Sequence, residues 1–103
     1  MFGRITRLEG SPDDIAQGID YVRQTILPAA RQIDGFRGLL NLADRESGKG
    51  LTITLWETEE AMRASEEAAN RMRDEAAAAL GAAIVGVERY EVTLSEVPAT
   101  ASA

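Results

Sequence analysis

Two runs of alternating residues on either side of the segment RESGKG (45–50) constrain the fold more than any other feature of this sequence. Residues 36–44 and 51–56 each alternate between two sets of side chains, which is the period of a β-strand. The glycines and charged residues between the runs are typical of a hairpin loop. A tight turn at Ser47-Gly48 predicts four cross-strand pairs: Leu42 with Ile53, Leu40 with Leu55, Asn41 with Thr54, and Leu39 with Trp56.

In this register the hairpin has two faces of different character. The first face is an apolar block made of Phe36, Leu40, Leu42, Leu51, Ile53 and Leu55. The second face is mixed and consists of Arg37, Leu39, Asn41, Ala43, Thr52, Thr54 and Trp56. A shift of one residue would mix the two sets, so the pattern specifies a two-faced hairpin.

A strand and a helix precede the hairpin. Residues 2–8 (FGRITRL) are rich in branched and aromatic side chains, as strands are. Ser11-Pro12 marks a helix start. An apolar stripe follows at Ile15, Ile19, Val22, Ile26, Ala30 and Ile33. Pro28 lies inside this stripe and lacks a backbone N–H, so a kink or a break is expected there, and Asp34-Gly35 is expected to end the helix.

A second helix and a fourth strand follow the hairpin. Thr58 is placed to cap the helix and Gly81 to end it, and residues 84–94 (IVGVERYEVTL) form the strand. The inward positions are predicted to be Met62, Ser65, Ala69, Met72, Ala76 and Ala79 or Leu80. The charged residues from Glu59 to Glu75 are predicted to form a solvated face. Because the helix is rich in alanine, it either lies close to the sheet or stands off and leaves a void for a ligand.

The resulting order, β-α-β-β-α-β, predicts an α+β domain of the ferredoxin-like type, with a four-stranded antiparallel sheet and two helices on one face. Residues 1–95 are expected to form this domain and residues 96–103 a flexible tail. Two helices cover only one face of such a sheet, yet both faces of the hairpin carry large apolar side chains. Exposing them would forfeit about 1.5–3 kcal/mol each, so a symmetric homodimer that packs two sheets face to face is predicted.

The composition narrows the classes of function. The chain has no histidine and no cysteine, which excludes thiol nucleophiles, histidine-based triads and the usual zinc and haem ligands. No metal or other cofactor is therefore expected. A net charge of −6 and a pI of about 4.6 argue against nucleic acid and membrane surfaces as partners. No segment resembles a signal peptide or a membrane span, so a cytoplasmic location is expected.

The segment GFRGLLNLADRESGKGLTITLWETEEAMRASEEA (35–68) resembles the dimeric α+β barrel proteins, specifically the antibiotic biosynthesis monooxygenase-like family. The matching features are Gly-Phe-x-Gly at the start of a strand, a turn rich in charge and glycine, and an apolar strand that ends in Trp56. A helix start rich in acidic residues and alanine follows. The predicted order of elements extends the resemblance over residues 2–94.

The resemblance implies a dimer whose two sheets face each other. It also implies a small-molecule cavity between sheet and helices, near the end of the third strand, and Trp56 matches a tryptophan that lines this cavity in several members. Some members oxidise aromatic polyketides with molecular oxygen and neither metal nor flavin, some degrade haem, and many have no known activity. The haem-degrading branch uses a histidine ligand in the second helix, which this chain lacks.

The candidate residues for a ligand pocket are Trp56, Asn41, Thr54, Leu39 and Tyr90. Trp56 either packs in the core only or also forms a wall for a flat ligand. Asn41 and Thr54 either bond to each other across the hairpin or hold a carbonyl or hydroxyl group of a ligand. Tyr90 could offer its hydroxyl to a bound aromatic molecule. The sequence identifies no catalytic acid or base.

The first strand places Arg4 and Arg7 on opposite faces. One of them must meet the surface that the helices cover, where a charge needs a partner. That partner is expected to be Glu88, Glu91 or an anionic ligand.

Two functions fit these observations. The first is a cofactor-independent monooxygenase acting on a small apolar, aromatic or polyketide-like molecule, with Trp56 and Leu39 shaping the pocket. The second is a non-catalytic dimeric protein that binds a metabolite or serves as a stress-related accessory protein. The second accounts directly for the lack of histidine, cysteine and any convergent pair of carboxylates.

Overall fold

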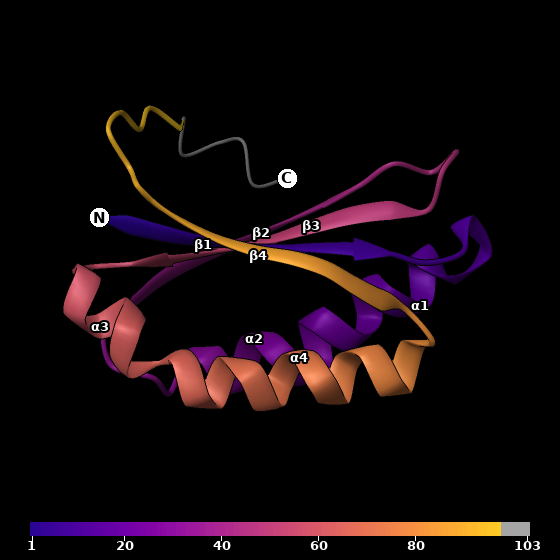
Figure 1. The fold of residues 1–103 in the computed structure, drawn as a ribbon, viewed down its shortest axis with the longest axis horizontal. Coiled ribbons are helices and arrows are strands. Elements are labelled where there is room, and N and C mark those ends of the chain that lie inside the picture. The colour runs from indigo at the N-terminus through magenta and orange to yellow at the C-terminus, as the bar shows by residue number, and fades with distance from the viewer. Residues whose placement is uncertain (98–103) are drawn as a thin grey trace.

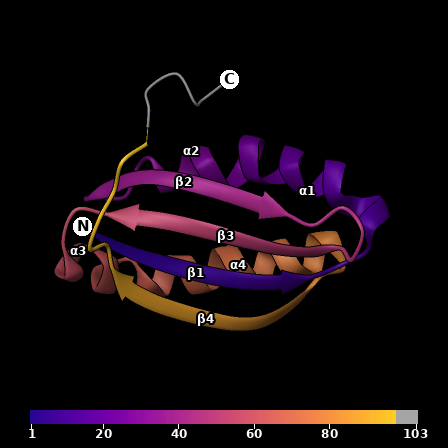
Figure 2. The same ribbon diagram turned by 90° about the horizontal axis from the view of Figure 1, so that it is seen from above.

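The chain, described here for residues 1–97 by a computed structural model, has the predicted order of strands and helices. The strands β1 (Phe2–Glu9), β2 (Phe36–Ala43), β3 (Lys49–Trp56) and β4 (Ala83–Glu91) form one antiparallel sheet in the order β2-β3-β1-β4. All helices lie on one side of this sheet (Figure 1), and the longer helical segments run along its length (Figure 2). The predicted ferredoxin-like fold is confirmed, and the predicted tail (96–103) lies outside the described residues from position 98 onward.

The first helical segment is interrupted as expected, but at a different place. It consists of a short 3-10 turn η1 (Pro12–Asp14), α1 (Ile15–Tyr21), a π-helical turn η2 (Val22–Ile26) and α2 (Leu27–Ala30). In η2 the Leu27 N–H donates to the carbonyl of Val22, five residues back. The helix therefore widens just before Pro28, and it ends at Ala30 rather than at Asp34-Gly35.

The second helical segment is broken at Ser65 into α3 (Glu59–Ala64) and α4 (Glu66–Leu80), where the sequence predicts one helix. The Ser65 hydroxyl donates to the carbonyl of Met62 at 2.6 Å, a local bond that competes with regular helix geometry. The predicted ends are confirmed. Thr58 accepts from the Ala61 N–H at 3.0 Å, and Gly81 adopts a left-handed φ of 64°.

The predicted hairpin register is wrong by two residues. The observed pairs are Leu42 with Leu51, Leu40 with Ile53, Asn41 with Thr52, and Leu39 with Thr54. The loop is longer than a tight turn because the Gly48 N–H donates to the carbonyl of Asp44, with Gly48 at a φ of 80°. Since the shift is even, these residues keep their predicted faces.

Phe36 is the exception, because its predicted face is wrong. The β2–β3 register shifts between Phe36 and Gly38, so that Gly38 lies opposite Leu55 and Phe36 opposite Trp56. A bulge of this kind inserts one extra residue and reverses the faces beyond it. Phe36 therefore joins Trp56, with their ring centroids 5.7 Å apart at an interplanar angle of 73°.

The sheet is covered by helices on one face only, as the hairpin pattern predicts. Four apolar side chains in the described part of the chain are buried: Ala30, Trp56, Met62 and Ala69. Leu40 and Leu42, on the opposite face, are 48% and 49% exposed. No helix within residues 1–97 is long and apolar enough to cross a membrane.

Candidate functional site

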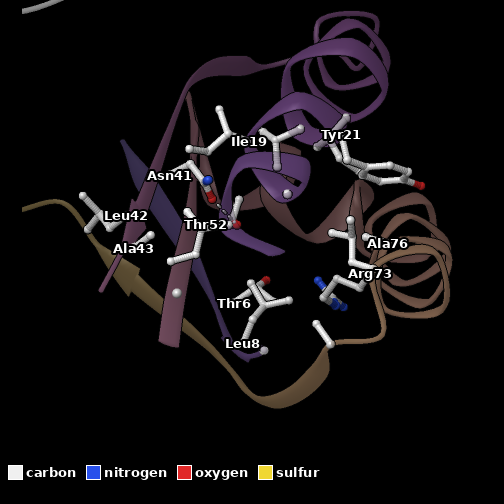
Figure 3. Close-up of a pocket in the computed structure, with 18 of the residues that line it drawn as sticks. Thr6, Leu8, Ile19, Tyr21, Asn41, Leu42, Ala43, Thr52, Arg73 and Ala76 are labelled. Atoms are coloured by element: carbon white, nitrogen blue, oxygen red, sulfur yellow. Dashed lines mark hydrogen bonds between the residues drawn. The ribbon is translucent and has the colours of Figure 1, made fainter. Parts of the chain in front are cut away.

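The space between the sheet and the helices is a cavity of about 170 Å³. Its walls come from β1, β2 and β3 on one side and from α1, η2 and α4 on the other (Figure 3). Small residues such as Gly18, Ala69 and Ala76 stand where larger ones would fill the space. The alanine-rich helix α4 therefore stands off from the sheet and leaves a void, rather than lying close against it. An apolar cavity of about 150 Å³ holds a benzene ring, so this one has room for a substituted aromatic ring.

The structure brings three of the five candidate residues to this cavity. Trp56, Thr54 and Asn41 form part of its wall. Leu39 lies opposite Thr54 on the helix-facing side of β2 but is not part of the wall. Tyr90 lies on the other face of the sheet, 53% exposed, where its hydroxyl donates to a carboxylate oxygen of Glu88 at 2.9 Å. That bond raises the pKa of Tyr90, and the residue does not reach the cavity.

Trp56 is held in place from several sides. Its indole N–H donates to the hydroxyl of Thr54 at 3.0 Å, and Phe36 meets the ring edge to face. The guanidinium carbon of Arg4 lies 5.5 Å from the ring centroid, within the range of a cation–π contact. With 2% of its surface exposed, Trp56 is both packed in the core and part of the cavity wall.

Asn41 makes a different cross-strand bond from the one predicted. The Thr52 hydroxyl donates to Oδ1 of Asn41 at 2.9 Å, because the observed register places Thr52 rather than Thr54 opposite Asn41. Thr54 is instead the acceptor for Trp56. The Asn41 carbonyl oxygen is occupied in this way, which leaves the amide nitrogen as the group able to donate to a ligand.

Arg4 is the arginine of β1 that meets the covered surface. Its side chain is 3% exposed, and Nη2 donates to the carbonyl of Met62 at 2.7 Å and to the hydroxyl of Ser65 at 2.8 Å. The break between α3 and α4 makes both acceptors available. The same nitrogen lies 3.1 Å from a carboxylate oxygen of Glu66. Burial lowers the pKa of Arg4 and Glu66 opposes that effect. Nε of Arg4 is buried and has no hydrogen-bond partner among the described residues.

Glu66 joins two arginines to the start of α4. It accepts from Nη2 of Arg89 at 2.8 Å and from Nε of the same residue, in addition to its contact with Arg4. The hydrogen bonds from Arg89 and the charge of Arg4 lower the pKa of Glu66 to about 2. The predictions of a solvated face and of Glu88 or Glu91 as the partner are therefore wrong at this position. Glu88 pairs instead with Arg7 on the uncovered face.

Arg73 of α4 also lines the cavity, and the sequence does not single it out. Figure 3 shows its side chain directed into the space between α4 and the sheet. It bonds to Oδ1 of Asn70, and no carboxylate oxygen of the described residues lies within 4.0 Å of its guanidinium. Burial lowers the pKa of Arg73, and the positive charge of Arg4 adds to this effect.

A spacing pattern could have identified these two residues. Met62, Glu66, Ala69, Arg73 and Ala76 recur at intervals of four, three, four and three along the chain. That spacing places all of them on one face of a helix. The predicted inward positions Ser65 and Met72 are confirmed, because Ser65 is buried and Met72 lines the cavity. Charged residues at two of the five positions of the second pattern obscure the fact that they face inward as well.

The charged residues of the cavity wall are mostly cationic. Arg4, Lys49 and Arg73 contribute three positive charges and Asp14 contributes one negative charge, whereas the whole chain carries −6. Within residues 1–97, no group of three or more acidic side chains lies close enough together to hold a metal ion. The wall therefore offers hydrogen-bond donors and positive charge beside an apolar surface.

No protein-family model matches the chain. It is 39% identical over 94 residues to the uncharacterized protein Rv2558 of Mycobacterium tuberculosis. That alignment covers 91% of this chain and 39% of the relative, so the chain spans about two fifths of the relative's length. The name of the relative states no activity.

Solved structures with the same fold include several oxygenases. An antibiotic biosynthesis monooxygenase-like protein from Deinococcus radiodurans has a TM-score of 0.70 and 21% identity, over 95% of this chain and 98% of that one. The monooxygenase ActVA-Orf6 of Streptomyces coelicolor, in complex with nanaomycin D, has a TM-score of 0.70 and 17% identity, over 95% and 92%. SnoaB, a cofactor-independent oxygenase from Streptomyces nogalater, has a TM-score of 0.65 and 14% identity, over 91% and 94%. At these identities the likeness establishes the fold, which is the one that the resemblance implies.

Proposed function

We propose that this chain binds a small aromatic or polyketide-like molecule between its sheet and its helices and oxidises it with molecular oxygen as a cofactor-independent monooxygenase. The observation that carries the proposal is the cavity of about 170 Å³, with its apolar wall, its fixed indole at Trp56 and its few hydrogen-bond donors. Small-molecule sites have this composition. The same fold in SnoaB, described as a cofactor-independent oxygenase, supports the choice of reaction.

The reaction requires the substrate to supply all the electrons. A ring CH2 group beside a phenol or enol becomes C=O. One oxygen atom of O2 enters the product, and the other leaves as water with the two hydrogens. Ionisation of the phenol or enol makes the ring a stronger electron donor. The amide nitrogen of Asn41 and the guanidinium of Arg73 can stabilise the negative charge that forms on the substrate.

The uncovered face of the sheet fits a second copy of the chain. Leu40 and Leu42 are about half exposed there. A homodimer would bury these side chains together with Leu51, Ile53 and Leu55, which share their face. Native mass spectrometry of the purified protein tests this: a dimer is expected, and a monomer at micromolar concentration would contradict it.

Oxygen uptake in the presence of hydroxyanthrones, which carry a ring CH2 group beside a phenol ring, tests the reaction. The wild-type protein is expected to raise the rate above that of the uncatalysed oxidation, and Asn41→Ala is expected to lower the catalysed rate by about tenfold to a hundredfold. Arg71→Met is the control, because the Arg71 side chain is 66% exposed and is not part of the cavity wall. A hydroxyanthrone that binds without faster oxygen uptake would contradict the oxygenase proposal.

One observation favours the second candidate, a non-catalytic protein that binds a metabolite. The wall of the cavity has a single carboxylate, Asp14, and that residue is exposed. No buried carboxylate therefore faces a ligand in the described part of the chain. Binding with no oxygen uptake for any ligand would support this candidate.

A further inference from the structure

We infer that the cavity selects an aromatic ligand that carries a negative charge, as a carboxylate or an ionised phenol, and that Arg73 is the side chain that pairs with this charge. The inference rests on the proposed function for the existence of a ligand in the cavity, and it adds the chemical class of that ligand. It requires no oxidation, so it applies equally to an enzyme and to a binding protein.

The first argument is the missing counter-charge of Arg73. Among the described residues, Arg73 forms no salt bridge, although Arg71 and Arg89 each form one. Asp74 follows directly in the sequence, but it is exposed and its carboxylate is more than 4.0 Å from the guanidinium. Since Arg73 is directed into the cavity, the open position beside it lies where a ligand would be (Figure 3). The hydrogen bond of Arg73 to Oδ1 of Asn70 is with a neutral group, so an anionic ligand would supply the counter-charge that this partly buried guanidinium lacks among the described residues.

The second argument is a local excess of positive charge. Glu66 is the single carboxylate that contacts Arg4 and Arg89, so it neutralises one of these two guanidiniums. Burial lowers the pKa of Arg73 and the charge of Arg4 adds to this effect, whereas Glu66 and Asp74 oppose it. The three arginines and Glu66 therefore leave two positive charges in a cluster from which Arg4 and Arg73 line the cavity, in a protein whose net charge is −6.

The third argument is the lack of acceptors on the charged part of the wall. The guanidinium groups of Arg4 and Arg73, which both belong to residues of the cavity wall, have hydrogen-bond donors and no acceptor. A carboxylate or phenolate supplies acceptor oxygens and no donor that would compete with Arg4 or Arg73.

A matched pair of ligands separates charge from shape. Cinnamate is an anion at neutral pH, and cinnamamide is a neutral molecule of nearly the same size and planarity. Isothermal titration calorimetry of the wild-type protein is expected to show that cinnamate binds about tenfold or more tightly than cinnamamide. A charge-assisted hydrogen bond accounts for a difference in affinity of this size. In Arg73→Met the ratio of the two dissociation constants is expected to fall towards one, because methionine keeps the apolar stem and removes the charge. In Arg73→Lys a preference for cinnamate is expected to remain.

Arg71→Met is the matched control, since it removes the same charge from the same helix at a position outside the cavity. It is expected to keep the wild-type preference. Equal affinities of the two ligands for the wild-type protein would overturn the inference and leave the binding site in place. A preference retained in Arg73→Met, or lost equally in Arg71→Met, would overturn the role of Arg73. Binding of neither ligand would overturn the inference together with the proposed binding function.

Discussion

The two faces of the sheet distribute their side chains in opposite ways. The face beneath the helices holds buried polar side chains, Arg4 and Thr6, and encloses a cavity. The uncovered face holds Leu40 and Leu42, each about half exposed. In an ordinary two-layer domain the covered face is the apolar one. The difference indicates that apolar packing alone does not hold the helices here, and that Arg4 and Glu66 attach α4 to the sheet at the end where Trp56 lies.

Removal of Glu66 gives the largest expected effect on the covered face. Glu66→Gln leaves the buried guanidinium of Arg4 without its carboxylate partner, and the free energy of unfolding is expected to fall by about 2–4 kcal/mol. Urea unfolding followed by circular dichroism measures this. Glu67→Gln is the control, because the Glu67 side chain is 92% exposed, and it should change stability by less than about 0.5 kcal/mol. Equal effects of the two substitutions would show that Glu66 does not hold α4 in place.

The same network predicts a dependence on pH. The pKa of Glu66 is lowered from 4.5 to about 2, so its ionised form is favoured in the folded protein. The stabilisation is complete above the unfolded-state pKa and is lost as the pH falls from about 4.5 to 2, with a total of at most about 3 kcal/mol. The difference in stability between the wild-type protein and Glu66→Gln should shrink across this range. A difference that stays constant from pH 4.5 to 2 would contradict the assigned pKa.

A change on the uncovered face should affect assembly and leave the fold intact. Leu40→Glu places a charge in the proposed interface and is expected to raise the dissociation constant of the dimer by at least about tenfold. Sedimentation equilibrium measures this constant. Ala78→Glu adds the same charge at an exposed position of α4 and should leave the constant unchanged. A tight dimer in Leu40→Glu would place the interface elsewhere.

The strand pattern predicted more of the site than the helix pattern did. Asn41, Thr54 and Trp56 were assigned to one face by their alternation, and an error of two residues in register did not change that face. The longer hairpin loop and the bulge before Gly38 depend on backbone hydrogen bonds that the residue pattern does not specify. The prediction fails for Tyr90, because nothing in the sequence relates the register of β4 to that of the hairpin.

The helix pattern did not predict the inward position of the two charged residues on which the site depends. Glu66 and Arg73 occupy inward positions, but they are surrounded by other charged residues of the same helix and look like part of its solvated face. The strand alone predicts that either Arg4 or Arg7 needs a partner on the covered face. It does not predict the identity of that partner, because the break at Ser65 decides which part of the helix reaches Arg4.

The position of Trp56 gives the protein an optical reporter of its own. It is the only tryptophan in the chain, it is 2% exposed, and a guanidinium lies over its ring at the edge of the cavity. Its emission should therefore lie at short wavelength in the folded protein and respond to a change in the surroundings of Arg4. Fluorescence titration without any attached dye can thus follow both the occupancy of the cavity and the detachment of α4 from the sheet.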